Sequence, residues 1–124
     1  LDKRKNDSLK TVDNVRRSVN MEITKHDWKL FQEKVGSWQS RYLDRLCREY
    51  AELLAEDRDA SERFWELDRR IRKDRKSPGV QIEMTKDMMV FDIVALIRNE
   101  TITMVDLDGF SAGLRETVAR VLSL

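Results

Sequence analysis

Residues 38–54 read WQSRYLDRLCREYAELL, and this stretch decides the fold. Its apolar side chains recur at steps of three and four residues, which is the spacing of one face of an amphipathic α-helix. The members of this stripe are Trp38, Tyr42, Leu43, Leu46, Cys47, Tyr50, Leu53 and Leu54. The intervening positions carry charges of both signs, as expected for a solvent-exposed face. The stretch therefore predicts a long helix with one buried side.

A second helix is expected after a short polar turn at residues 57–59, and we predict that it spans residues 60–76. Its expected inward side chains are Phe64, Leu67 and Ile71. Neighbouring helical positions diverge by about 100°, so one of Phe64 and Trp65 must reach a helix boundary or the surface. Two amphipathic helices joined by a short link predict an antiparallel helical hairpin.

A shorter helix is expected ahead of the hairpin, over residues 25–35. Thr24 with Asp27 three residues later is a helix-start signal, because the two side chains can cap the first turn. Gly36 and Ser37 are predicted to break this helix, or to offer a cap, before the long one begins.

A phrase that occurs twice predicts a small β-ribbon. VNMEITK at residues 19–25 is echoed by VQIEMTK at residues 80–86. Both phrases alternate apolar and polar residues, and alternation at period two is a strand signal. We therefore expect two short paired strands, at 19–24 and 80–85, which packing on the helices would have to support.

The C-terminal third of the chain predicts further helices. Pro78 and Gly79 end the hairpin, and residues 88–97 are apolar on nearly every side, which is typical of a buried central helix. Residues 103–107 read as one capped turn. Ser111 then caps a last helix, whose apolar stripe is Leu114, Val118, Val121 and Leu122.

The chain has 124 residues, which suits one domain, and we assign that domain to residues 21–124. Two explanations stay open for the polar, basic residues 1–20: a basic N-terminal arm, or sequence upstream of a true start at Met21 that was wrongly included. The predicted fold class is mostly α, with a helical hairpin, a buried central helix, a C-terminal helix and the two-stranded β-ribbon.

The composition favours a soluble cytoplasmic protein with no membrane association. Charged residues make up 38% of the chain, but the formal net charge is +1 and 40% of residues are hydrophobic, which is enough for a core. No run approaches the roughly 20 apolar residues that cross a bilayer, and no signal peptide is visible. The single Cys47 fits a reducing compartment and is expected in the core.

The sequence shows no pattern typical of an enzyme. His26 is the only histidine, and the only cysteine, Cys47, lies on a different predicted helix, so a zinc site lacks ligands. A Gly-rich phosphate loop and a nucleophile motif are also missing. We therefore expect no catalytic residue, no cofactor and no metal ion.

The clearest candidate for binding is a basic run at the end of the second hairpin helix. Its cations are Arg69, Arg70, Arg72, Lys73, Arg75 and Lys76, against the single acid Asp74. Such a cluster could neutralise the phosphates of RNA or DNA. It could equally be a solvated helix end, because the helix dipole favours cations there. For contacts with a protein partner we assign Trp65, Arg69, Arg72 and Lys73.

Four segments carry a resemblance to a known family: TKHDWKLF at 24–31, FWEL at 64–67, PGV at 78–80 and DLDGFS at 106–111. Over residues 21–124 the chain resembles a family of uncharacterised small bacterial proteins often found near mobile genetic elements. The resemblance transfers no catalytic or binding residue. We expect a small non-enzymatic interaction module with an accessory or regulatory role, whose partner is an unknown protein or a second copy. The alternative is a nucleic-acid-binding protein that uses residues 69–76.

Overall fold

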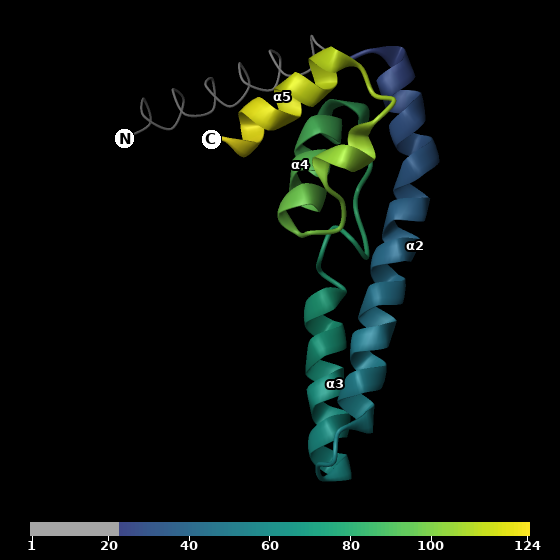
Figure 1. The fold of residues 1–124 in the computed structure, drawn as a ribbon, viewed down its shortest axis with the longest axis vertical. Helices are drawn as coiled ribbons and strands as arrows, with labels where there is room; N and C mark the ends of the chain where they lie inside the picture. Colours follow the sequence, from purple (N-terminus) through teal and green to yellow (C-terminus); the bar gives the residue numbers. More distant parts are fainter. Residues whose placement is uncertain (1–22) are drawn as a thin grey trace, which may run out of the picture.

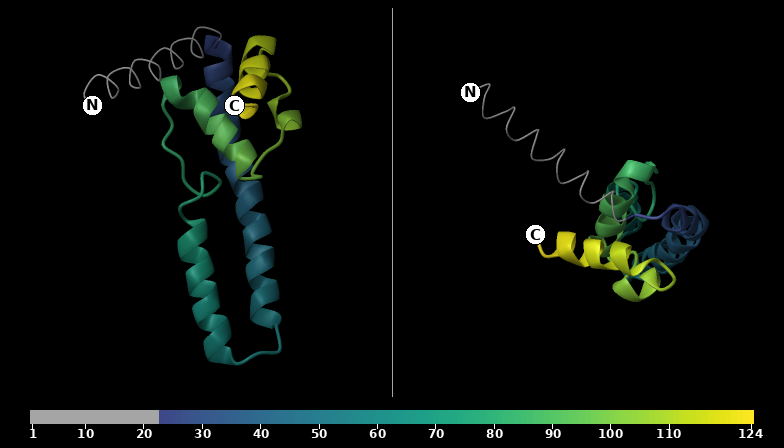
Figure 2. Two further views of the ribbon diagram at one scale, coloured as in Figure 1. Left: turned by 90° about the vertical axis from the view of Figure 1, so that its left-hand side faces the viewer. Right: turned by 90° about the horizontal axis from the view of Figure 1, so that it is seen from above.

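The computed structural model describes residues 23–124, and Figure 1 shows that one long helix forms the spine of this part of the chain. The elements are α2 (Lys25–Ala55), α3 (Ala60–Asp74), η1 (Lys86–Met88), α4 (Met89–Arg98), η2 (Met104–Leu107) and α5 (Ala112–Leu122). α3 returns antiparallel along one half of α2, whereas α4, η2 and α5 gather at its other half (Figures 1 and 2). We call residues 41–76 the arm and the rest of the described chain the head. The predicted hairpin is confirmed, and so is the mostly α fold class.

α2 begins at a complete capping box. The Thr24 hydroxyl accepts a hydrogen bond from the backbone N–H of Asp27 (3.0 Å), and the Asp27 carboxylate accepts one from the N–H of Thr24 (3.1 Å). The helix then runs unbroken to Ala55, so the predicted break at Gly36 is wrong. The buried stripe stays in phase across the glycine: Phe31, Val35, Trp38 and Tyr42. One glycine costs a helix only about 1 kcal/mol, and the burial of this stripe outweighs that.

The core lies in the head, around α4. Met89, Val90, Ile93 and Leu96 of this helix are fully buried, so the prediction of a buried central helix is confirmed. The side chains packed around them are Phe31, Val35, Trp38, Ile102, Leu107, Phe110, Leu114, Val118 and Val121. They come from α2, η2, α5 and the intervening turns, so every element except α3 and η1 contributes buried side chains to the core of the head.

The predicted β-ribbon is wrong for the described residues. Residues 81–85 are an extended segment without strand pairing, and Thr24 is the N-cap of α2. The alternation has another cause: Ile82 and Met84 are half-buried against the core of the head, whereas Gln81 and Glu83 point to solvent. Apolar and polar residues alternate in any extended segment that has one buried side and one solvent-exposed side. The rest of the first expected strand, and the proposals for residues 1–20, lie outside the described residues.

A buried carboxylate joins the starts of α2 and α5. Asp27 is fully buried, and its oxygens accept hydrogen bonds from the N–H of Ser111 (2.8 Å) and the Ser111 hydroxyl (2.6 Å) as well as from Thr24. Ser111 also caps α5, as predicted, by accepting from the N–H of Leu114. Burial by itself would raise the pKa of Asp27, but these hydrogen bonds outweigh it and lower the pKa. Asp27 is therefore an ionised clasp between two helices.

A tight neck connects the arm to the head. Gly79 is buried against the ring of Tyr42, and a Cβ at this position would lie 2.5 Å from the ring and 2.6 Å from the Thr101 hydroxyl. Arg41 of α2 forms an ion pair with Asp106 (3.0 Å). These contacts fix the base of the arm, so the arm projects from the head at a defined position.

Candidate functional site

The arm is held together by a thin seam. Leu46 and Leu53 of α2 are buried, but no residue of α3 is. Polar contacts along one side supplement the seam: Arg70 pairs with Glu49 at 2.9 Å, and the Arg63 guanidinium donates to the Leu54 carbonyl at 2.6 Å. Near the middle of the arm, the hydroxyl of Tyr50 donates to Asp74, and the Arg70 guanidinium lies 5.5 Å from the centre of the Tyr50 ring. Burial, and then the hydrogen bond to Asp74, raise the pKa of Tyr50. Because no residue of α3 is buried, much of the arm's surface faces solvent.

The arm exposes five large apolar side chains. Their exposed fractions are 41% for Leu43, 43% for Leu54, 61% for Phe64, 54% for Trp65 and 38% for Ile71. The prediction that one of Phe64 and Trp65 reaches the surface is confirmed, since both do. The predictions that Phe64 and Ile71 point inward and that Cys47 lies in the core are wrong. The reason is that each helix of a hairpin has a single neighbour, which covers a narrower stripe than these helices carry.

Most of these side chains share one flank of the arm. On α2, Leu43 and Leu54 project to one side of the buried Leu46–Leu53 seam, and Glu49 projects to the other. On α3, Phe64 and Ile71 lie on one side of Leu67, and Arg70 on the other. Because the Glu49–Arg70 ion pair joins the two polar flanks, the two apolar flanks also meet, on the opposite side of the arm. We call this surface the apolar flank and define it by Leu43, Cys47, Leu54, Phe64 and Ile71.

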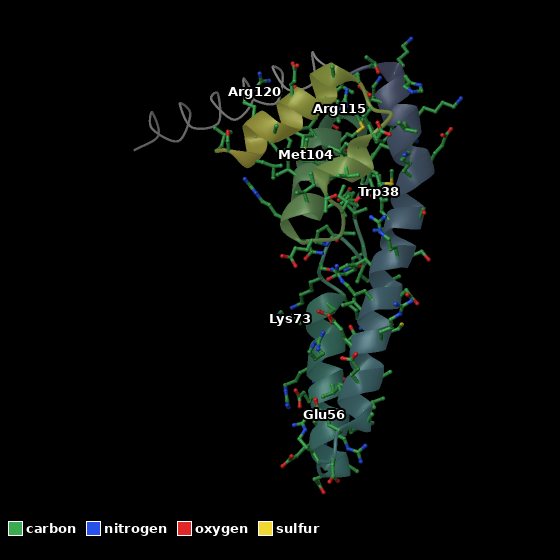
Figure 3. The ribbon with its side chains drawn as sticks, in the orientation of Figure 1. Trp38, Glu56, Lys73, Met104, Arg115 and Arg120 are labelled. Atoms are coloured by element: carbon green, nitrogen blue, oxygen red, sulfur yellow. The ribbon has the colours of Figure 1, made fainter. Side chains whose placement is uncertain are left out.

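Trp65 borders the apolar flank and starts a second stripe along the outside of α3. Its ring packs edge-on against Phe64, with the ring centres 5.0 Å apart. It also lines a shallow depression with Arg69 and with Arg58, Ser61, Glu62 and Glu66. Arg72 and Lys73 follow Arg69 at helical spacing, and Figure 3 places Lys73 on the side of α3 that faces away from α2. The structure therefore brings Trp65 and Arg69 together, with Arg72 and Lys73 further along the same face.

The six cations of the predicted nucleic-acid site divide into two groups. Arg70 and Arg72 pair with carboxylates of the arm, Arg70 with Glu49 and Arg72 with Asp68. The other four are exposed and form no ion pair with the described residues: Arg69, Lys73, Arg75 and Lys76. Four cations thus remain available to an outside partner, rather than six.

Charge is strongly polarised along the arm. Glu49 and Arg70 mark the level that divides it into a tip half, residues 49–68, and a base half, residues 41–48 and 69–76. The tip half holds eight carboxylates against two arginines, and the base half holds nine cations against two carboxylates. Glu56, labelled in Figure 3, lies at the acidic tip. The arm is therefore an electric dipole with an apolar flank, a combination that the composition of the whole chain conceals.

Residues 23–124 hold neither a candidate metal site nor a candidate membrane span. No group of His, Cys, Asp and Glu side chains there could hold a metal ion, and His26 is exposed. No helix in this part of the chain has the length and apolar character needed to span a membrane. A scan of protein-family models, a search of curated proteins and a search of solved structures found no match to this chain.

Proposed function

We propose that this protein is a small non-enzymatic interaction module that docks a protein partner through its arm. The observation that carries the proposal is the exposure of five large apolar side chains on the arm, with Phe64 and Trp65 packed together near its tip. We further propose, on the sequence resemblance alone, an accessory or regulatory role in a bacterial mobile element.

The composition of the outer face of α3 favours protein recognition. Interface hot spots are enriched in tryptophan and arginine, and Trp65 and Arg69 line the same shallow depression. Arg72 and Lys73 extend this face with charge that could orient a partner. The proposed contact residues are Trp65, Arg69, Arg72 and Lys73.

The test is capture from a lysate of the source organism with the tagged full-length chain, quantified by mass spectrometry. The double variant Trp65→Ala/Arg69→Ala should reduce at least one captured protein by more than about tenfold, because hot-spot truncations cost about 2 kcal/mol or more. The matched control is Val105→Ala/Arg115→Ala, an exposed apolar–arginine pair on the head. Equal capture by the wild type and both variants would overturn the proposal.

The alternative function is nucleic-acid binding through Arg69, Arg70, Arg72, Lys73, Arg75 and Lys76. What favours it is that four of these cations remain unpaired within the described part of the chain. Phosphate binding releases counterions, so affinity for mixed-sequence RNA or DNA should fall steeply with salt. Fluorescence anisotropy with the wild type and with Arg69, Lys73, Arg75 and Lys76 changed to Ala measures this. An absence of binding at low salt would remove the alternative.

A further inference from the structure

We propose that the apolar flank binds a second copy of the chain, with the two arms antiparallel in a four-helix bundle. This inference rests on the proposed function, because it names one partner of the arm. It uses a different face from the Trp65–Arg69 stripe, so the two proposals can fail separately.

The first step is the shape of the unburied surface. The apolar flank presents side chains from both helices of the hairpin on one side, whereas the opposite side carries the Glu49–Arg70 pair. A hairpin with one apolar side completes its core when an identical side covers it, which is the geometry of a four-helix bundle. A second copy supplies the matching surface without any further protein.

The second step is the direction of pairing. With eight carboxylates at the tip half and nine cations at the base half, parallel arms would place like charges together at both ends. Antiparallel arms place the acidic tip half of each copy beside the positively charged base half of the other. Two-fold symmetry makes this contact twice, so the charge pattern selects the antiparallel dimer.

The third step is the size of the contact. α3 has 15 residues and is therefore about 22 Å long, and two helices side by side are about 20 Å wide. The pair of arms would then bury on the order of 1,000 Å² in total, which is the lower limit for a specific interface. We expect a reversible, concentration-dependent dimer rather than an obligate one.

The experiment is sedimentation equilibrium of the full-length chain across a wide concentration range. The wild type should show a monomer–dimer equilibrium. The double variant Leu43→Gln/Leu54→Gln should weaken it by more than about tenfold, because both side chains are exposed in the monomer and would be buried in the dimer. The matched control Val105→Gln, at an 82% exposed position of the head, should leave the equilibrium unchanged. A wild type that stays monomeric throughout overturns the inference.

A charge variant tests the direction of pairing. Asp57 and Glu62 are exposed acids of the tip half that form no ion pair in the described structure. Asp57→Asn/Glu62→Gln should weaken an antiparallel dimer, since it removes attraction to the partner's base, and would strengthen a parallel one. Raising the salt from about 50 mM to about 500 mM should also weaken the wild-type dimer. Strengthening in either experiment overturns the antiparallel arrangement. Loss of dimer with intact Trp65-dependent capture would leave the proposed function standing.

Discussion

At the scale of single residues, two buried or half-buried carboxylates of the head have opposite effects on stability. Asp27 accepts hydrogen bonds from Ser111 and Thr24 and stays ionised. Asp92 has one carboxylate oxygen that is buried without a hydrogen-bond partner in the described structure. Burial, and then the negative charges of Glu83 and Asp87, raise the pKa of Asp92 to about 6. The first side chain stabilises the fold at neutral pH and the second opposes it.

The substitution Asp27→Asn should lower the free energy of unfolding by about 2 kcal/mol at pH 7, because it removes charge-assisted hydrogen bonds at two helix starts. The folded-state pKa of Asp27 lies below its usual 3.8. Its stabilisation is therefore present above about pH 4 and is lost as the pH falls through the folded-state pKa. Urea unfolding at pH 7 and near pH 2.5 measures this. Asp108→Asn, at an exposed position, is the control, and a pH-independent difference would contradict the prediction.

The substitution Asp92→Asn should raise the free energy of unfolding at pH 8 by on the order of 1 kcal/mol, once solvent screening at this half-buried site is allowed for. The raised pKa means that the folded state prefers the neutral carboxyl. That preference favours folding below about pH 4 and is lost as the pH rises through about 6. The wild type and the variant should therefore differ little at pH 4. A larger gain at pH 4 than at pH 8 in thermal unfolding would rule this account out.

At the scale of elements, the helices show what local sequence could and could not predict. The caps at Thr24 and Ser111 and the buried α4 followed from side-chain chemistry and spacing alone. The break at Gly36 did not occur, because the burial of a stripe that runs past the glycine exceeds the local cost. The exposure of Phe64 and Ile71 could not be predicted either, because an apolar stripe does not show how many neighbouring helices will cover it. The separation of charge along the arm can be recognised in the sequence, but only when the hairpin register, which places Glu49 beside Arg70, is known.

Two glycines should respond to alanine in opposite directions. A Cβ at Gly36 has no atom within 4 Å, so Gly36→Ala should stabilise the protein by about 0.5–1 kcal/mol through helix propensity. A Cβ at Gly79 would overlap the Tyr42 ring, so Gly79→Ala should destabilise it by about 1–3 kcal/mol. Thermal unfolding of the two variants makes the comparison. Equal shifts would show that the neck is looser than described.

At the scale of the whole molecule, stability is divided unequally between the head and the arm. The head contains the core around α4, whereas no residue of α3 is buried. Regions with few buried apolar contacts open first. The proposed docking surface therefore lies on the less stable part of the molecule, where a partner could supply the missing packing.

Hydrogen exchange should reveal this division directly. At low protein concentration, the amides of α3 should exchange at least about tenfold faster than those of α4, because local opening of the arm leaves the head intact. At high concentration, pairing of the arms should slow exchange in α3 and leave α4 unchanged. Mass spectrometry of peptides from both helices provides the measurement. Uniform exchange across α3 and α4 would contradict the unequal division.

The three tryptophans differ in solvent exposure, so their intrinsic fluorescence can report on different parts of the molecule. Trp38 is buried in the core of the head (Figure 3), Trp28 is half-buried, and the side chain of Trp65 is exposed to solvent. An aqueous quencher such as iodide will therefore quench Trp65 first, and the remaining tryptophan fluorescence will come mainly from the head. Covering Trp65 would shift its fluorescence emission to shorter wavelengths. Docking on the arm and unfolding of the head would therefore produce distinguishable changes in the emission spectrum of the unlabelled protein.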